Sequence, residues 1–296
     1  MIKMVCAFLI VKEGTMSTTS NMIQPFFDLD TSSFKVTSST IYSPSRMVIY
    51  ELEASRPTSL TLRIIPSPYI EWIIGYNDDN DSATFYCIGL QTEYKEIKLK
   101  AYKHFFGVRF DEKGAYFGKG AASDSYPALL KDSVSDYSPE KDSFEKILID
   151  NLKASQSSKE RIKAFTNYLS KSKTFVALLP IVCDIVDDIN ASKGTLPILQ
   201  LPDKYGYSSR HITRLFFISY GLTPKEYAKL IRFQCVIKEI LKYPNLEIGK
   251  LIGGYGYSDQ AHFHRDFKKM MHTTPRAFEL LCREQIAKEN KKKKKA

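Results

Sequence analysis

The stretch Gly206–Phe216, GYSSRHITRLF, is echoed fifty residues later by GYSDQAHFHRDF at Gly256–Phe267. Each copy is followed by a threonine–proline pair, at Thr223-Pro224 and at Thr274-Pro275. Glycine accepts the left-handed conformation of a tight turn between helices, and a serine such as Ser208 suits the N-cap of the next helix. The repeated phrase therefore predicts that one helix–turn–helix unit occurs twice in this chain.

The helix after each turn has an apolar face and a polar face. Apolar side chains recur at helical spacing, at Ile212, Leu215 and Phe216 and again at Phe263 and Phe267. The opposite faces carry Arg210, Thr213 and Arg214 in the first copy and Gln260, His264 and Arg265 in the second. Arginine can bond guanine and glutamine can bond adenine in the major groove of DNA. An ordinary amphipathic helix is the alternative, and the repetition in a basic module favours base reading.

A long helix is predicted between the two copies. Thr223, Pro224 and Glu226 form a capping-box pattern with proline at the first helical position. The helical pattern continues to Lys242 and stops before Pro244. Nineteen residues at about 1.5 Å each make a rod of roughly 28 Å. Because adjacent major-groove faces lie about 34 Å apart, such a rod can hold two reading heads on one side of a duplex.

Positive charge is concentrated in the second half of the chain. Residues 1–170 contain 20 Lys and Arg against 21 Asp and Glu, whereas residues 171–296 contain 23 against 12. The excess in the second half remains +6 when Lys291–Lys295 are set aside. This asymmetry favours a polyanionic partner for the second half, with simple solubility as the alternative.

The chain is predicted to be α+β, with a β-rich first part and an all-helical second part. Short apolar runs from about residue 34 to 120 are typical of a barrel or sandwich: SSFKVTSSTIY, RMVIYELEA, SLTLRIIP, YIEWIIGY, ATFYCIGLQ and KHFFGVRF. VCAFLIV at Val5–Val11 is read as a first strand. Two helical stripes follow, through Phe144, Ile147, Leu148 and Leu152 and through Ile162, Phe165 and Leu169. We expect domains at 1–165 and 175–284, then a disordered basic tail at 285–296.

Residues 178–283 resemble the AraC/XylS family of bacterial transcription regulators, above all through GYSDQAHFHRDFKK and TTPRAF. The resemblance implies a double helix–turn–helix domain that binds double-stranded DNA. It implies base-reading positions at Arg210, Thr213, Arg214, Gln260, Ala261, His264 and Arg265. Our candidates for phosphate contacts are Ser208, Lys225, Ser258, Lys268, Lys269 and Arg276.

Two departures from the family pattern affect the first helix of each motif. Pro202 and Ile252 stand where the family usually has alanine, and Pro202 should disturb its helix by removing a hydrogen bond. Gly253 and Gly254 should weaken the matching helix of the second motif. We expect the first motif to be the less regular of the two.

The first half resembles, more loosely, the cupin-like sensory domains of one branch of this family, through YSPS, IIP and FFGVRF. The resemblance implies an effector site or a dimer contact. Four aromatic residues are candidates for an effector pocket, with plain core as the alternative: Trp72, Tyr76, Tyr86 and Tyr102. Candidate partners besides DNA are a small-molecule effector, RNA polymerase and a second copy of the chain. No membrane partner is expected.

Other chemistry is poorly supported by the sequence. The five cysteines are far apart, and the HFH triplet places its histidines on different faces of a helix, so no metal site and no cofactor are predicted. Phosphate-loop, dinucleotide and nucleophile-elbow motifs are missing. The prediction is a cytoplasmic transcription regulator and not an enzyme. The alternatives are an architectural or non-specific nucleic-acid-binding protein and, less favoured, an enzyme whose catalytic residues lie in the first half.

Overall fold

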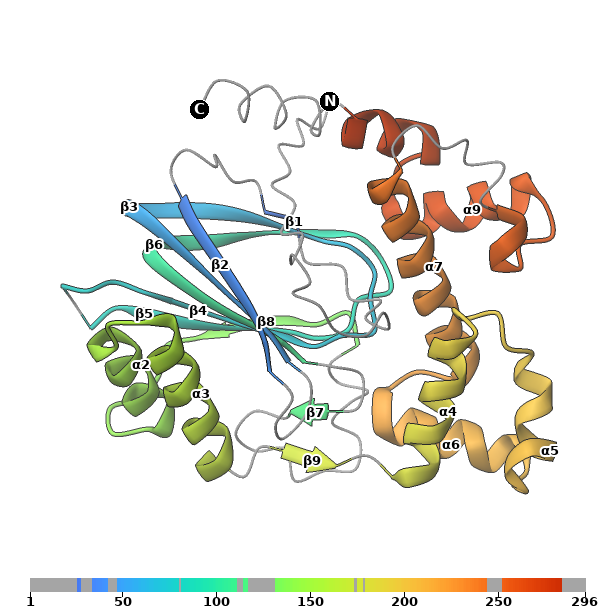
Figure 1. Cartoon of the computed structure of the whole chain (residues 1–296), viewed down its shortest axis with the longest axis horizontal. Helices are drawn as coiled ribbons and strands as arrows, with labels where there is room; N and C mark the ends of the chain where they lie inside the picture. The colour runs from blue at the N-terminus through green and yellow to red at the C-terminus, as the bar shows by residue number, and fades with distance from the viewer. Residues whose placement is uncertain are drawn as a thin grey trace.

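The computed structural model describes residues 26–27, 34–41, 47–79, 81–110, 114–116, 131–172, 175–177, 179–243 and 252–283 (Figure 1). The predicted strand at Val5–Val11 and the predicted disordered tail at 285–296 lie outside these residues. The described chain forms a sheet unit followed by a helical unit, which is the predicted α+β arrangement.

The sheet unit is built on a seven-stranded antiparallel sheet. Its strands pair in the order β1-β3-β6-β4-β5-β8, and β2 also pairs with β3. Their bounds are β1 (Phe26–Phe27), β2 (Phe34–Ile41), β3 (Met47–Ile64), β4 (Glu71–Tyr76), β5 (Ala83–Ile88), β6 (Lys95–Phe110) and β8 (Val134–Tyr137). A separate two-stranded sheet pairs β7 (Gly114–Tyr116) with β9 (Phe175–Ala177).

One strand differs from the sequence-based expectation. RMVIYELEA and SLTLRIIP were expected to be two strands, but both belong to the 18-residue β3. The strand continues through Arg56 and Pro57 because its register against β6 shifts between Glu53 and Leu60, which absorbs the break. This long strand bends across the sheet and contributes to the cores on both faces.

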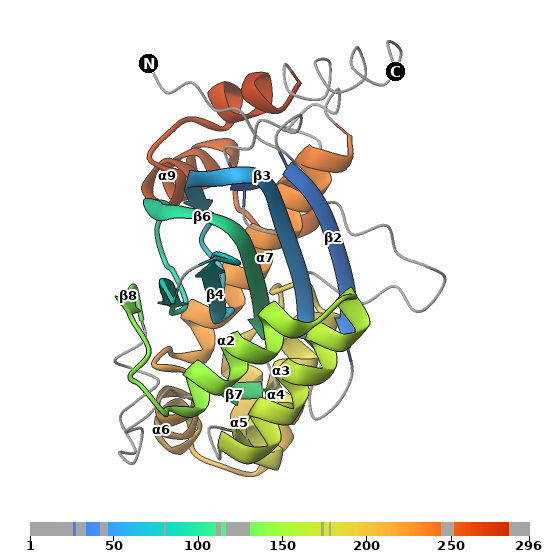
Figure 2. The same ribbon diagram turned by 90° about the vertical axis from the view of Figure 1, so that its left-hand side faces the viewer.

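Two helices cover one face of the sheet, as Figure 2 shows. They are α2 (Phe144–Ala154) and α3 (Ser158–Ser172), both at the predicted places. Leu148 and Leu152 of α2 and Phe165 of α3 are buried against β4 and β6, where Trp72 meets the ring of Phe165 edge-on. Helix α3 continues to Ser172, so residue 165 lies inside it.

The helical unit follows after residue 179. Its elements are α4 (Pro180–Ala191), η1 (Ile198–Gln200), α5 (Leu201–Tyr205), α6 (Ser209–Tyr220), α7 (Pro224–Lys242), η2 (Gly253–Tyr255) and α9 (Gln260–Met271), and residues 275–283 are also helical. The apolar faces of α4, α6, α7 and α9 form one core, in which Phe216, Phe233 and Phe267 are fully buried.

The two units contact each other through loops of the sheet. Ile65 and Leu90 are buried in the core of the helical unit. Gln234 of α7 donates to the backbone oxygen of Pro66 at 2.5 Å, and the amide of Tyr94 donates to the backbone oxygen of Met270 in α9 at 2.7 Å. The last turn of α9 is therefore held directly by the sheet unit.

Candidate DNA-binding site

The first candidate reading helix is α6, and its local sequence explains both of its ends. Gly206 has φ of +71° and open space around it, so it makes the turn out of α5. The hydroxyl of Ser208 accepts a hydrogen bond from the amide of His211 at 3.3 Å, which confirms the predicted N-cap. The helix ends at Gly221, also with positive φ. Ile212 and Phe216 are buried, so the face with Arg210 and Arg214 points outward.

The second candidate reading helix is α9. Its N-cap is Asp259, whose side chain accepts from the amide of His262 at 2.7 Å. Ser258 donates to the Asp259 carboxylate at 3.0 Å. These bonds lower the pKa of Asp259, the amide of His262 contributing most. Phe263 and Phe267 are fully buried, which orients the rest of the helix.

The predicted DNA-contact side chains lie outside the core. Thr213 is half-buried, and the other predicted base-reading and phosphate-contact residues are exposed. Arg276 is engaged by Glu279 at 3.1 Å, although its side chain is 64% exposed. Within the described chain the remaining basic candidates form no ion pair: Arg210, Arg214, Lys225, Arg265, Lys268 and Lys269. Uncompensated arginine and lysine at exposed positions are suited to phosphate and base contacts.

The two helices lie toward opposite ends of α7 (Figure 1). This spacer runs from Pro224 to Lys242, the predicted 19 residues. Its capping box is present in full, because Thr223 accepts from the amide of Glu226 and Glu226 accepts from the amide of Thr223. A straight helix of this length spans roughly 28 Å.

Both motifs have an irregular first helix, as expected, but the first motif is not the less regular of the two in its second helix. The chain before Pro202 forms the 3₁₀ turn η1, and α5 begins at Leu201, because Pro202 has no amide hydrogen to bond the oxygen of Ile198. Gly253 and Gly254 lie in a second 3₁₀ turn, η2. We expected the first motif to be less regular than the second. Their second helices, α6 and α9, do not differ in this way, because each has 12 residues and a side-chain N-cap.

Sequence reasoning missed Arg232, which ties the two motifs to the spacer. Its guanidinium donates to the backbone oxygen of Gly194, with Nη2 at 2.8 Å and Nε at 3.2 Å. Nη1 reaches the backbone oxygen of Gly256 at 3.4 Å, and the group lies 5.5 Å from the ring centroid of Tyr257. One side chain of α7 therefore contacts the turn before the first motif and the turn inside the second.

A second tie joins α7 to α9. Lys229 forms an ion pair with Asp266 at 2.8 Å. The sequence signal for these two residues is weak, because a basic residue in a long helix is ordinarily a solvated position. Only the packing of α9 beside α7 shows that Lys229 and Arg232 face the second motif.

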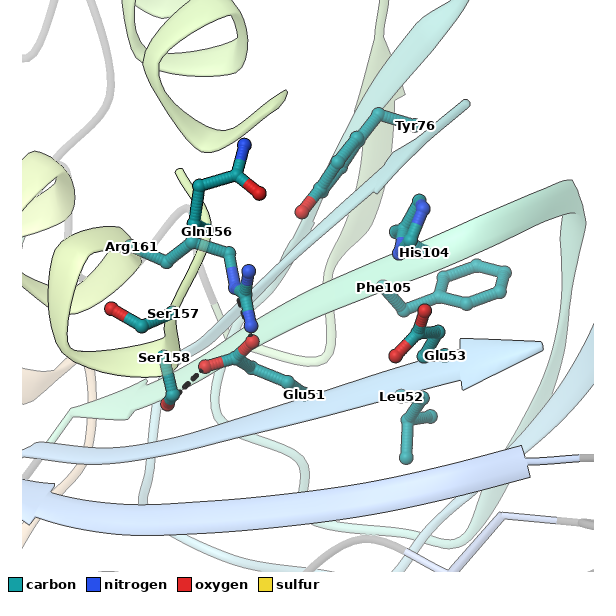
Figure 3. A pocket seen from close by; sticks show the side chains of 10 residues that line it. All are labelled: Glu51, Leu52, Glu53, Tyr76, His104, Phe105, Gln156, Ser157, Ser158 and Arg161. Carbon is teal, nitrogen blue, oxygen red and sulfur yellow. Dashed lines mark hydrogen bonds and ion pairs between the residues drawn. The ribbon is translucent and has the colours of Figure 1, made fainter. Parts of the chain in front are cut away.

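The four aromatic candidates for an effector pocket do not line one pocket. Trp72 and Tyr76 belong to the core under α2 and α3, whereas Tyr86 and Tyr102 belong to the core on the other face of the sheet. Tyr102 is bonded to Thr84, and Tyr86 accepts from the amide of Lys100. They separate because side chains alternate between the faces of a strand. Only Tyr76 lines the described cavity, which lies beside α3 (Figure 3).

The described residues were also compared with the requirements of a metal site and of a membrane-spanning helix. No group of three or more potential metal ligands is present among these residues. No helix in the same part is long and apolar enough to cross a membrane. Cys87, Cys183, Cys235 and Cys282 are free thiols.

Comparison with known proteins places the candidate site in a described domain. Residues 201–280 match the family described as a helix-turn-helix domain. A probable transcription factor, PqrA of Proteus vulgaris, is 37% identical over 78 residues, which are 26% of this chain and 63% of that protein. The match thus spans less than two thirds of that relative.

Solved structures of ToxT from Vibrio cholerae are among those that match this chain. An apo variant has a TM-score of 0.43 and 13% identity, covering 84% of this chain and 98% of its own. The protein of strain O395 has a TM-score of 0.40 and 14% identity, covering 85% and 98%. The match over residues 201–280 includes the capped helices α6 and α9, so the C-terminal part of this chain contains a helix-turn-helix domain, as the resemblance to the AraC/XylS family implied.

Proposed function

We propose that this protein is a transcription regulator that binds specific duplex DNA, with α6 and α9 reading adjacent segments of the major groove. The observation that carries the proposal is the pair of capped 12-residue helices joined by the 19-residue α7, with their polar faces exposed. Two heads at this separation match the repeat of the groove along one side of B-DNA.

The proposed roles differ between side chains. Arg210, Thr213 and Arg214 of α6 and Gln260, Ala261, His264 and Arg265 of α9 read base edges. Ser208, Lys225, Ser258, Lys268, Lys269 and Arg276 contact phosphates and fix the position of the domain on the duplex. The exposed positions of these side chains, apart from the half-buried Thr213, support the assignment, and Arg276 would have to exchange its contact with Glu279 for a phosphate.

The sheet unit is proposed to respond to a small-molecule effector. Its direct bond from Tyr94 to α9 and the ion pair between Lys131 and Glu226 at the start of α7 would carry a change in the sheet to the reading heads. RNA polymerase and a second copy of the chain stay predicted partners. A regulator of this kind acts on the bacterial chromosome, so the proposed location is the cytoplasm.

Selection from a random DNA library with the full-length chain tests the function. We expect one enriched motif with two parts whose centres lie about 10–10.5 base pairs apart, because each head reads one groove segment. An unselective pool would instead favour an architectural or non-specific nucleic-acid-binding protein.

Two substitutions on one helix then separate reading from positioning. Arg265→Ala should cost about 1–3 kcal/mol and relax the preference at one base pair of the selected site. Lys269→Ala, the matched control on α9, should weaken binding on all sequences and reduce the salt dependence of the affinity. The role assigned to Arg265 is wrong if its loss weakens all sequences equally, and that of Lys269 is wrong if the salt slope is unchanged.

A further inference from the structure

A cavity of about 260 Å³ lies between the sheet and the start of α3 (Figure 3). Side chains from β3, β4 and β6 form one wall, and the first turn of α3 forms the other. The polar groups that matter here are those of Glu51, Glu53, Tyr76, His104, Ser158 and Arg161. The volume is below the usual range for drug-sized ligands, so an occupant must be small.

Part of this polar lining is already satisfied within the protein. The carboxylate of Glu51 accepts from Arg161 Nε at 2.5 Å and from the hydroxyl of Ser158 at 2.5 Å. Arg161 also donates through Nη1 to the backbone oxygen of Ser155 at 3.2 Å. Nε2 of His104 lies 2.9 Å from an oxygen of Asp78. Glu51 and Arg161 thus neutralise each other, and His104 is held by Asp78.

The hydroxyl of Tyr76 has no such partner. The residue is only 4% exposed, and its ring is stacked on that of His104 with 5.1 Å between the ring centroids. Figure 3 shows the phenol oxygen directed into the space beside Arg161. Among the described residues this hydroxyl has no hydrogen-bond partner, and because it lines the cavity its oxygen is available to an occupant. Burial above all raises the pKa of Tyr76, so it remains a neutral hydroxyl.

Glu53 supplies a carboxylate that has no direct ion-pair partner among the described residues, although it acts on Lys103 at longer range and contributes to raising the pKa of that lysine. Glu53 is exposed at the open side of the cavity and forms no ion pair within the described chain. Lys103 follows Tyr102 on β6 and precedes His104, which lies opposite Glu53 in the sheet. The ammonium group of Lys103 forms an ion pair with Asp78 at 2.5 Å. The lining therefore offers an occupant the carboxylate of Glu53 and the phenol oxygen of Tyr76. The guanidinium of Arg161 is already paired with Glu51.

We propose that this cavity binds a small organic ammonium compound, whose N–H groups are accepted by the Glu53 carboxylate and the Tyr76 oxygen. A positive ligand is favoured over a neutral or negative one because the carboxylates outnumber the guanidinium in the lining. A polar tail suits the remaining wall, which includes Gln156 and Ser157. The proposal rests on the effector role proposed for the sheet unit and names the chemical class of that effector; binding is measured without DNA, so its failure leaves the proposed DNA reading standing.

Isothermal titration calorimetry of the full-length chain without DNA tests it with three probes of equal length. These are 4-amino-1-butanol, which is positive, 1,4-butanediol, which is neutral, and 4-hydroxybutyrate, which is negative. We expect the amine to bind at least about tenfold more tightly than the diol, because a charge-assisted hydrogen bond is the stronger kind. No heat of binding for the amine, equal affinity for the diol, or a preference for the anion at Arg161 would each overturn the proposal.

Variants locate the site. Glu53→Gln should weaken amine binding about tenfold and abolish the preference over the diol, and Tyr76→Phe should weaken it several-fold. Asp79→Asn removes a carboxylate from the exposed turn that does not line the cavity, and it should change nothing. Because Glu53 is exposed and Tyr76→Phe keeps the ring, unchanged circular dichroism is expected for both. Amine binding that is unaffected by both substitutions would place the ligand elsewhere and refute the assignment.

Discussion

Replacing Gly194 by alanine is the sharpest test of how the first motif is mounted on α7. Gly194 follows α4 with φ of +75°, and its carbonyl oxygen accepts both bonds from Arg232. An added Cβ would lie 2.2 Å from the backbone oxygen of Ala228 and 2.7 Å from the backbone nitrogen of Arg232. Both atoms belong to the backbone of α7, which cannot turn aside as a side chain can, so the turn itself must move.

The magnitude follows from two parts. A left-handed conformation costs an alanine about 1–2 kcal/mol. Moving the turn away from α7 also weakens the hydrogen bonds of Arg232, and bonds to a charged group contribute about 1.5–3 kcal/mol. We therefore expect Gly194→Ala to lower the free energy of unfolding by about 2.5–5 kcal/mol. Gly206→Ala is the matched control, because φ there is +71° and nothing lies within 4 Å of the added Cβ. It should cost only about 1–2 kcal/mol.

Urea unfolding of the full-length chain measures this difference with two signals. Far-ultraviolet circular dichroism follows the helices, and the fluorescence of Trp72, the single tryptophan, follows the sheet unit. We expect Gly194→Ala to shift the helical transition to lower urea more than Gly206→Ala does, with a smaller effect on the Trp72 transition. Equal transition midpoints for the two variants would refute the argument that contact with α7, and not backbone conformation alone, requires glycine at 194.

Three further outcomes are expected. Arg232→Ala should relax the dependence of DNA affinity on the spacing between the two halves of a selected site, measured by inserting one base pair, because the side chain contacts both motifs; unchanged dependence would contradict its bridging role. The pKa of Glu226 is lowered from 4.5 although burial raises it, because the capping-box amide and Lys131 outweigh burial. The stabilisation from Glu226 is therefore present above the pKa of the unfolded state and is lost as pH falls through the pKa of the folded state. Glu226→Gln should make the free energy of unfolding less dependent on pH in the acid range. An unchanged pH dependence would contradict this role of Glu226. Glu71→Leu should cost about 3–5 kcal/mol, because it removes the buried carboxylate that accepts from both Arg109 and the hydroxyl of Tyr50, and Trp72 fluorescence during urea unfolding should report it, with an unshifted midpoint as the contrary result.

The local sequence determined the elements of the DNA-binding domain. Thr223 and Glu226 cap α7 from within three residues of each other, and Ser208 caps α6 in the same way. Gly206 and Gly256 both have the positive φ that their turns require. Such features are readable in advance because the interacting groups lie within one helical turn of each other along the chain.

Tertiary structure decided how distant segments meet. A register shift against β6 joined two expected strands into β3, and the alternation of the sheet separated Trp72 from Tyr102. The bridge from Arg232 to Gly194 and Gly256, and the unpartnered hydroxyl of Tyr76 beside α3, involve residues far apart in the chain. The sequence by itself determined where helices begin, end and present polar faces, because those depend on neighbouring residues. Which faces meet depends on the packing of whole elements against one another, and only the folded chain decides that.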